Sequence, residues 1–414
     1  MGPFPLFWSP VNKTLIAATA LVTLVTGVGL APLAQGATAN TVVATIGVGS
    51  FPFGVAVTPD GTRAYVTNAG DDTVSVIDTG TNSVAATIST GLGPTLVAIS
   101  PNGTRAYVAN SSGNSVTVIN TATTTVVATI PVGQSPQGVA VSPNNATVYV
   151  TNLDDGTVSV IRTLDNTVTS TINVGGSPTY VSFTPDGTRA YVADRNNNWV
   201  KVINTTATPP VVIGSPIAVG TTPVSVVISP DGTRAYVTNQ SSNSVSVIRT
   251  SDNTVASTIS VGAGPTNSGI SSDGATLYVP NQDDGTVSVI NTATGQVIDL
   301  ITIGSGSYPG TVAASPSGQR AYVTNSQFNT VSVISLVGAA TGPNIPTAPM
   351  QAYQRTATAT CASNAPSWVN WPGIATQTFD AWSASWQQWP GNGTGGYVCE
   401  RQPYFTTIGT WSVQ

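Results

Sequence analysis

The sequence predicts an all-β fold, a seven-bladed β-propeller of four-stranded antiparallel blades. The first observation is the motif Tyr65-Val-Thr-Asn68, whose variants begin at six further tyrosines: Tyr107, Tyr149, Tyr191, Tyr236, Tyr278 and Tyr322. These tyrosines are 42, 42, 42, 45, 42 and 44 residues apart. The second observation is composition, because 41 Gly, 29 Pro and only 7 % charged residues in 414 suit many short turns. A near-fixed period of this size indicates a repeat architecture.

Each repeat predicts four strands, which we name A, B, C and D. In the first unit they fall within residues 54–61, 62–68, 72–78 and 83–88, and each is rich in Val, Ile, Thr or Tyr. The A–B turn is Pro59-Asp-Gly61, a sequence suited to a tight turn. A sheet of this size cannot bury both faces alone, so the sheets must stack on one another.

The ends of the array favour a closed ring over a linear solenoid, which needs capping repeats. The seventh unit has patterns for strands A, B and C, and then the D pattern is missing. A spare D pattern, Thr41-Val-Val-Ala-Thr-Ile46, is identical to Thr125–Ile130. We therefore expect the N-terminal strand to complete the last blade.

The repeated motif resembles the YVTN β-propeller repeat family of secreted and surface-layer proteins of bacteria and archaea. The resemblance covers about residues 41–338. It implies a surface or interaction propeller. Related propellers include lactonase-like enzymes, so the resemblance alone does not choose between binding and catalysis.

Four segments are expected along the chain. Residues 1–39 predict a secretory signal peptide, with Lys13 before an apolar run and small residues at Ala37 and Ala39; a retained membrane anchor is the alternative. Residues 40–338 form the propeller, 339–350 a proline-rich linker, and 351–414 a tryptophan-rich module. The only cysteines, Cys361 and Cys399, predict one disulfide in that module.

Composition limits the chemistry. The chain has no histidine, which excludes histidine triads, histidine bases and histidine metal ligands. Its net charge of −5 and the lack of a basic run argue against nucleic acid as a partner. No second hydrophobic segment follows the signal, so we expect a secreted or envelope-associated monomer without a transmembrane segment after cleavage.

The best metal candidates are the acidic pairs of the B–C turns: Asp71, Asp72, Asp154, Asp155, Asp283 and Asp284. Oxygen-only ligands suit Ca²⁺. However, aspartate is ordinary in turns, and pairs in different blades lie far apart around a ring. The stronger expectation is therefore no cofactor and no metal.

Residues that vary at the start of strand A are the candidates for a ligand-reading pore rim: Phe53, Leu96, Gln137, Tyr180, Ser225, Asn267 and Thr311. By contrast, the tyrosines occur in every blade and predict packing between blades. The motif asparagines are expected to bond neighbouring loop backbone. The arginines two residues before five of these tyrosines are expected to pair with turn carboxylates or carbonyls.

The tail holds six of the eight tryptophans. Trp382, Trp386 and Trp389 have helical spacing, so either a helix face packed in a core or a sugar-stacking surface is expected. Blade four is irregular, with Asp194, Trp199 and Lys201 in place of smaller residues.

The leading function is therefore a binding scaffold with no catalysis, whose partner is a protein or an envelope polysaccharide. Two alternatives stay open. One is a lactonase-like or other metal-dependent hydrolase with Asp and Asn ligands at the pore face. The other is attachment to cell-wall carbohydrate through the tryptophan-rich module.

Overall fold

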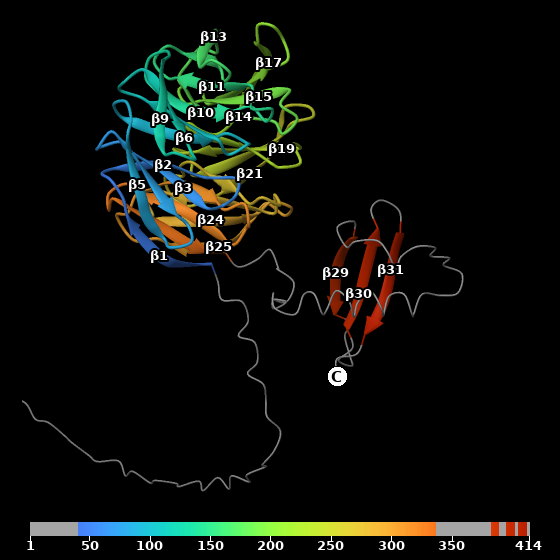
Figure 1. Cartoon of the computed structure of the whole chain (residues 1–414). Helices are drawn as coiled ribbons and strands as arrows, with labels where there is room; N and C mark the ends of the chain where they lie inside the picture. Colours follow the sequence, from blue (N-terminus) through green and yellow to red (C-terminus); the bar gives the residue numbers. More distant parts are fainter. Residues whose placement is uncertain (1–39, 337–381, 389–394, 402–404, 412–414) are drawn as a thin grey trace, which may run out of the picture. The chain divides into compact units, whose positions relative to one another are not determined.

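The computed structural model describes residues 40–336 and three strands of the tail, at 382–388, 395–401 and 405–411. Residues 40–336 form seven four-stranded antiparallel sheets, arranged as a propeller (Figure 1). The predicted signal peptide, the linker and Cys361 lie outside the described residues. In the described ranges, no helix is both long and apolar enough to span a membrane.

The strands follow the A–B–C–D order expected from the repeat. The innermost A strands are β2 (Pro52–Val57), β6 (Pro94–Ile99), β10 (Pro136–Val141), β14 (Pro178–Phe183), β18 (Pro223–Ile228), β22 (Gly269–Ile270) and β26 (Pro309–Ala314). The B strands are β3 (Arg63–Asn68), β7 (Arg105–Asn110), β11 (Thr147–Asn152), β15 (Arg189–Asp194), β19 (Arg234–Asn239), β23 (Thr276–Asn281) and β27 (Arg320–Asn325).

The C strands are β4 (Thr73–Asp78), β8 (Ser115–Asn120), β12 (Thr157–Arg162), β16 (Trp199–Asn204), β20 (Ser244–Arg249), β24 (Thr286–Asn291) and β28 (Thr330–Ser335). The outer D strands are β5 (Ser83–Ser89), β9 (Thr125–Pro131), β13 (Thr167–Asn173), β17 (Val211–Ala218), β21 (Thr254–Ser260), β25 (Gln296–Thr302) and β1 (Thr41–Gly47).

The N-terminal strand β1 completes blade seven, as the spare D pattern predicts. It pairs antiparallel with β28, from Thr41 opposite Ser335 to Gly47 opposite Thr330. The sheet order is β1-β28-β27-β26. The two ends of the propeller are therefore held in one sheet, and sheets of this kind leave only short edges.

The motif tyrosines pack between blades, as expected. Tyr65 is fully buried and shares a core cluster with Val108 and Ile119 of the next blade. Its counterparts are at most 4 % exposed. Burial raises the pKa of Tyr149 and Tyr278 to about 12, so these phenols stay neutral and act as packing groups.

Threonine hydroxyls join neighbouring blades, and they come from alternating strands. In blades one, three and seven the donor is the motif threonine on strand B, as where Thr324 donates to the Phe53 carbonyl at 2.9 Å. In blades two, four and six the motif has Ala or Pro there, and the threonine directly after the D–A proline donates instead, as where Thr266 donates to the Pro309 carbonyl at 3.0 Å. A hydroxyl is kept at the junction although its position changes, which identifies the motif threonine as structural.

Blade five departs from this pattern. Its motif threonine, Thr238, is fully buried, and its hydroxyl has no hydrogen-bond partner among the described residues. The hydroxyls of Ser225, directly opposite on β18, and of Ser268 in blade six are also buried without a partner. The junction of blades five and six thus lacks the inter-blade hydroxyl bond.

The inner strand of blade six is irregular, which accounts for part of the difference at the junction of blades five and six. The third motif residue is Pro280, whose carbonyl faces strand A and accepts from the Thr266 N–H at 2.9 Å. Proline has no N–H to donate to the same side. Accordingly β22 has only two residues, and Asn267 forms a parallel bridge with Thr311 of blade seven instead.

The described part of the tail is a three-stranded antiparallel sheet in the order β29-β30-β31. Its strands are β29 (Trp382–Gln388), β30 (Gly395–Arg401) and β31 (Phe405–Trp411). The helix expected from the tryptophan spacing is wrong, because Trp382 and Trp386 lie in β29. A spacing of four places two positions on the same face of a strand as well as of a helix, so the spacing was ambiguous.

Candidate functional site

The predicted pore-rim residues do not form one ring of exposed side chains. Phe53 and Gln137 follow the strand-initial proline directly, whereas the other five stand one residue further along. Four of the seven are buried, and three are partly exposed: the buried residues are Leu96, Ser225, Asn267 and Thr311, and the partly exposed ones are Phe53, Gln137 and Tyr180.

Two of the buried rim residues join blades six and seven. The Asn267 side-chain amide donates to the Thr311 hydroxyl at 3.1 Å. Among the partly exposed residues, Gln137 donates to Ser111 at 2.9 Å, and burial raises the pKa of the Tyr180 phenol. These contacts support the inner strands.

The acidic pairs hold loops rather than converge on one point. Asp71, Asp155 and Asp284 each accept a backbone N–H from the preceding D–A loop, at 2.6, 2.8 and 2.6 Å. The Ser50 N–H lowers the pKa of Asp71. Asp72 accepts the Gly93 N–H of the following loop at 2.7 Å. Among the described residues, no group of three Cys, Asp or Glu side chains could hold a metal ion.

The motif asparagines bond strand C, which corrects the expectation that they bond loop backbone. The Asn68 amide donates to the hydroxyls of Thr73 and Ser75, both at 2.9 Å. In blade four, the buried Asp194 replaces the asparagine and accepts the Trp199 indole N–H at 2.6 Å. The irregular residues of blade four therefore fill the same structural position.

Lys201, the only lysine after the predicted signal, has a structural position as well. Its ammonium donates to the Val174 carbonyl and lies 5.3 Å from the centre of the Trp199 ring. A cation over an aromatic face is a favourable contact.

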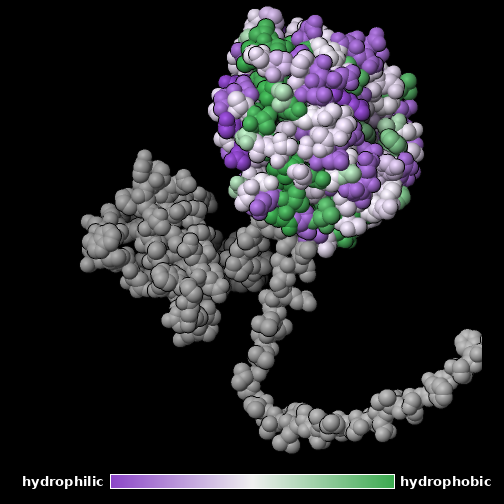
Figure 2. Space-filling model, turned by 180° about the vertical axis from the view of Figure 1, so that it is seen from behind, coloured by the Kyte–Doolittle hydropathy of each residue, from purple (hydrophilic) through white to green (hydrophobic). Residues whose placement is uncertain are grey.

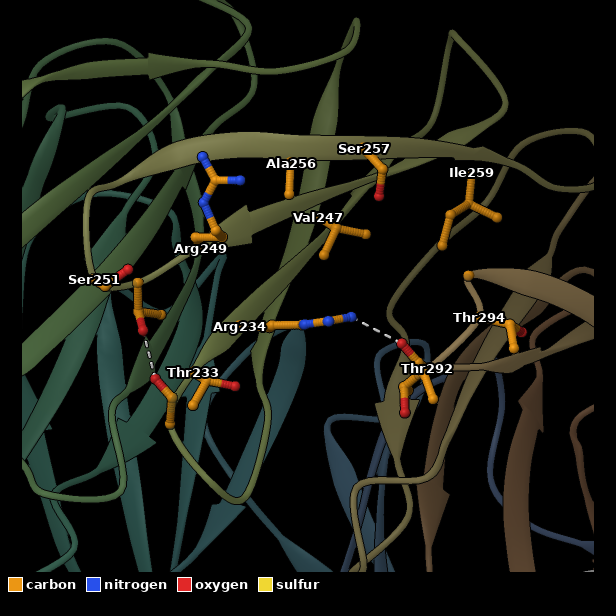
Figure 3. A pocket seen from close by; sticks show the side chains of 14 residues that line it. Thr233, Arg234, Val247, Arg249, Ser251, Ala256, Ser257, Ile259, Thr292 and Thr294 are labelled. Carbon is orange, nitrogen blue, oxygen red and sulfur yellow. Dashed lines mark hydrogen bonds between the residues drawn. The ribbon is translucent and has the colours of Figure 1, made fainter.

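A cleft of about 620 Å³ lies between blades five and six (Figure 3). It is formed by the A–B turn and strands C and D of blade five, and by the C–D turn of blade six. Its lining residues are Gly232, Thr233, Arg234, Val247, Arg249, Thr250, Ser251, Ala256, Ser257, Ile259, Thr292, Ala293, Thr294 and Gly295. The volume falls within the usual range of ligand pockets, roughly 300–1,000 Å³.

This cleft belongs to the face opposite the predicted rim. In an antiparallel A–B–C–D sheet, the A–B and C–D turns share one end, and the B–C turns and D–A loops share the other. Figure 2 shows several separate hydrophobic patches with polar side chains between them on the side of the propeller turned toward the viewer.

Arg234 is anchored across the cleft. Its Nη1 donates to the Thr292 carbonyl of blade six at 2.9 Å, and Figure 3 shows the side chain reaching toward that residue. Arg63, Arg189 and Arg320 make the same bond to the next blade, at 2.7, 2.8 and 2.8 Å. The prediction that these arginines bond carbonyls is confirmed for these four.

Arg249 is less constrained. Its Nε donates to the Asp252 carboxylate at 3.2 Å, and its Nη2 donates to Thr254 at 2.7 Å. The Arg249 and Asp252 side chains are 52 % and 47 % exposed. Arg249 was not among the residues predicted from the sequence, although the ends of the seven C strands carry arginine only there and at Arg162.

The tail residues proposed for sugar stacking are only partly within the described chain. Trp382 and Trp386 lie in β29, and Trp389 lies outside the described residues. Cys399 lies in β30, opposite Ala384 and Thr407.

Residues 134–311 match the model of the family described as "Choice-of-anchor I domain". No curated protein matches the chain. Among solved structures, 1567 chains match, so the fold is shared too widely to identify an activity. One is hydrazine synthase of Kuenenia stuttgartiensis, at 21% sequence identity and a TM-score of 0.64, covering 69% of this chain and 96% of that chain. This likeness shows the fold alone, a propeller.

Proposed function

We propose that this protein is a cell-surface propeller that acts as a binding scaffold and holds its ligand in the cleft between blades five and six. The match to the family described as "Choice-of-anchor I domain" supports the cell-surface placement. The matched residues, 134–311, include both blades that form the cleft. The resemblance of the repeats to the YVTN family points to the same location.

The observation that carries the proposal is the cleft itself. Its lining combines hydroxyls, two arginines and the exposed Ala256 with Val247 and Ile259, which belong to the buried core of the junction. Such a mixed lining suits ligand recognition. The acidic pairs on the other face bond the D–A loops. This use of the carboxylates favours binding over the alternative of a metal-dependent hydrolase.

Co-sedimentation of the purified full-length protein with isolated cell envelopes tests this function. We expect saturable binding that Ala256→Trp reduces, because the indole would fill the cleft. Thr169→Trp is the matched control, since Thr169 holds the equivalent position on strand D of blade three and is exposed. No envelope binding, or equal binding by both variants, would contradict the proposal, as would turnover of lactones or esters.

A further inference from the structure

Blade five carries two arginines directly opposite each other, Arg234 on β19 and Arg249 on β20. The equivalent pairs in the other six blades contain at most one arginine: Arg63–Asp78, Arg105–Asn120, Thr147–Arg162, Arg189–Asn204, Thr276–Asn291 and Arg320–Ser335. Like charges directly opposite are destabilising. In a chain of net charge −5 with only 12 basic residues, this pair is a local exception.

The two arginines line the same cleft but differ in how firmly they are held. Arg234 is fixed by its bond to Thr292, which places one positive charge at the junction. Arg249 pairs with Asp252, and both side chains are about half exposed. Exposed ion pairs of this kind are weak, so a ligand carboxylate can replace Asp252 at the guanidinium. Guanidinium groups bind carboxylates through two parallel hydrogen bonds.

The remaining lining matches the other parts of a sugar. Hydroxyls of Thr233, Ser257 and Thr294 offer donors and acceptors for sugar hydroxyls. Figure 3 shows Ala256, Ser257 and Ile259 along β21. Ser257 and Ile259 are two positions apart and share one face of the strand, and Ala256 is the unpaired residue of a β-bulge, between Ser257 opposite Val247 and Val255 opposite Ile248. These hydroxyls suit the hydroxyl edge of a pyranose ring, and the exposed Ala256 methyl offers a small apolar contact to its C–H face.

We propose that the cleft between blades five and six binds the carboxylate-bearing sugar of an acidic polysaccharide, with Arg249 contacting the carboxylate. This inference rests on the proposed binding function and adds the ligand class. Arg249 forms the exchangeable contact, and Arg234 supplies a fixed positive charge beside it. When the ligand carboxylate displaces Asp252 from Arg249, Asp252 keeps the hydrogen bond that it accepts from the Thr254 hydroxyl at 2.8 Å.

Isothermal titration of the full-length protein with trigalacturonate tests this inference, with cellotriose as the neutral sugar and hexaglutamate as the acidic peptide. We expect trigalacturonate to bind, its affinity to fall as salt rises, and cellotriose to bind at least about tenfold more weakly. Arg249→Gln should weaken trigalacturonate binding by about tenfold or more. Arg162→Gln, the same position in blade three, should leave it unchanged.

Several results would overturn the inference. One is that cellotriose binds as tightly as trigalacturonate, and another is that hexaglutamate binds and trigalacturonate does not. The others are that Arg162→Gln weakens trigalacturonate binding as much as Arg249→Gln does, or that Arg249→Gln leaves this binding unchanged. Arg249→Gln removes a repelling charge, so we expect it to fold, and a melting curve of each variant verifies this. Envelope binding that Ala256→Trp reduces, together with no trigalacturonate binding, would reject the ligand class and leave the binding function standing.

Discussion

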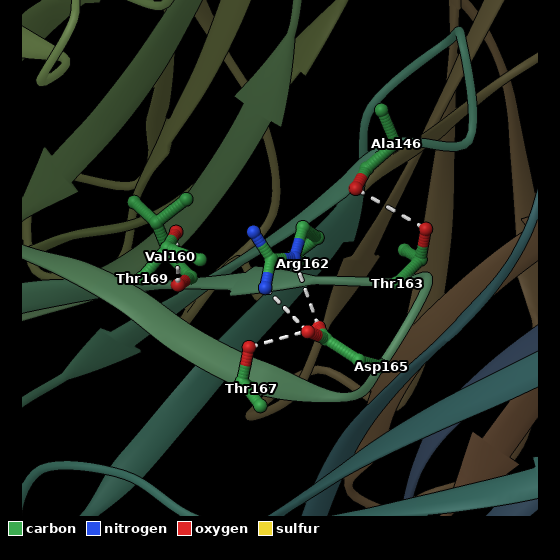
Figure 4. A network of polar contacts seen from close by, with 7 residues as sticks. All are labelled: Ala146, Val160, Arg162, Thr163, Asp165, Thr167 and Thr169. Atoms are coloured by element: carbon green, nitrogen blue, oxygen red, sulfur yellow. Dashed lines mark hydrogen bonds and ion pairs between the residues drawn. The ribbon is translucent and has the colours of Figure 1, made fainter.

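Blades three and five carry the same arrangement at the end of strand C, but its surroundings differ. In blade three, Arg162 pairs with Asp165, which also accepts from Thr167 at 2.8 Å (Figure 4). In blade five, Arg249, Asp252 and Thr254 repeat this network. The residue opposite is Thr147 in blade three and Arg234 in blade five.

The difference teaches where a repeat protein can carry function. A network that recurs in two blades is explained by turn chemistry, so the Arg162 network needs no ligand. The second arginine and the cleft distinguish blade five. Its junction with blade six also lacks the hydroxyl bond that joins the other blades, as Thr238 shows. Each prediction below therefore compares equivalent substitutions in blade three and blade five.

The largest expected effect is the same in both blades. Ile161→Ala and Ile248→Ala each remove a fully buried side chain at an equivalent position. Each should lower the free energy of unfolding by about 2–5 kcal/mol, measured by urea denaturation. A large disparity between the two would show that the blade cores differ, and the comparison would then lose its basis.

The buried motif threonines should separate the blades. The Thr151 hydroxyl of blade three accepts the Gly138 N–H at 2.7 Å and donates to the Thr179 carbonyl at 3.3 Å, whereas the Thr238 hydroxyl has no partner among the described residues. Thr151→Val should cost about 1–3 kcal/mol of unfolding free energy, because buried partners are left unpaired. Thr238→Val should be neutral or stabilising by the same urea measurement. Equal costs would show that Thr238 is bonded in solution.

Replacing Arg249 should destabilise the protein less than replacing Arg162. Arg249→Gln relieves repulsion with Arg234, so its urea midpoint should equal or exceed that of the unaltered protein. Arg162→Gln removes an exposed ion pair without such relief, so its midpoint should be equal or lower. A lower midpoint for Arg249→Gln than for Arg162→Gln would argue against repulsion in blade five.

The smallest effect concerns the two aspartates. The Arg162 guanidinium, followed by the Thr167 hydroxyl, holds the pKa of Asp165 well below its usual range. For Asp252 the Thr254 hydroxyl is the main cause of a lowered pKa. A lowered pKa in the folded state adds stability above the unfolded pKa of about 3.9, and this stability is lost as pH falls through the folded value.

Carboxyl NMR titration should therefore place both aspartates below about 3.9, with Asp165 the lower. The stability gap between the unaltered protein and Asp165→Asn should narrow as pH falls below that value. A gap that widens on acidification would contradict the assigned sign. Titration of either carboxyl above about 3.9 would show that its hydrogen bonds are absent in solution.

Most of the fold could be predicted from the sequence, because the repeats contain recurring turn residues and strand patterns. Tyr65 and its copies identify the packing between blades, and the Thr41–Ile46 pattern identifies ring closure, which the pairing of β1 with β28 confirms. Pro280 shortened the inner strand of blade six, an effect visible only once its carbonyl was seen to face strand A.

The candidate site was less accessible to sequence reasoning. The pore-rim residues were predicted only because they differ between blades, and four of them are buried in the structure: Leu96, Ser225, Asn267 and Thr311. Recognising the pair of Arg234 and Arg249 requires the register of β19 against β20, which joins residues 15 positions apart. Only that register shows that two positive charges lie directly opposite each other.

The central claim is that the cleft between blades five and six holds the ligand of this propeller. Envelope binding by Arg249→Gln and Arg162→Gln, measured side by side with the full-length protein at low and high salt, tests it most directly. We predict that Arg249→Gln loses most binding at low salt and that Arg162→Gln binds like the unaltered protein. Equal binding by the two variants would contradict the claim.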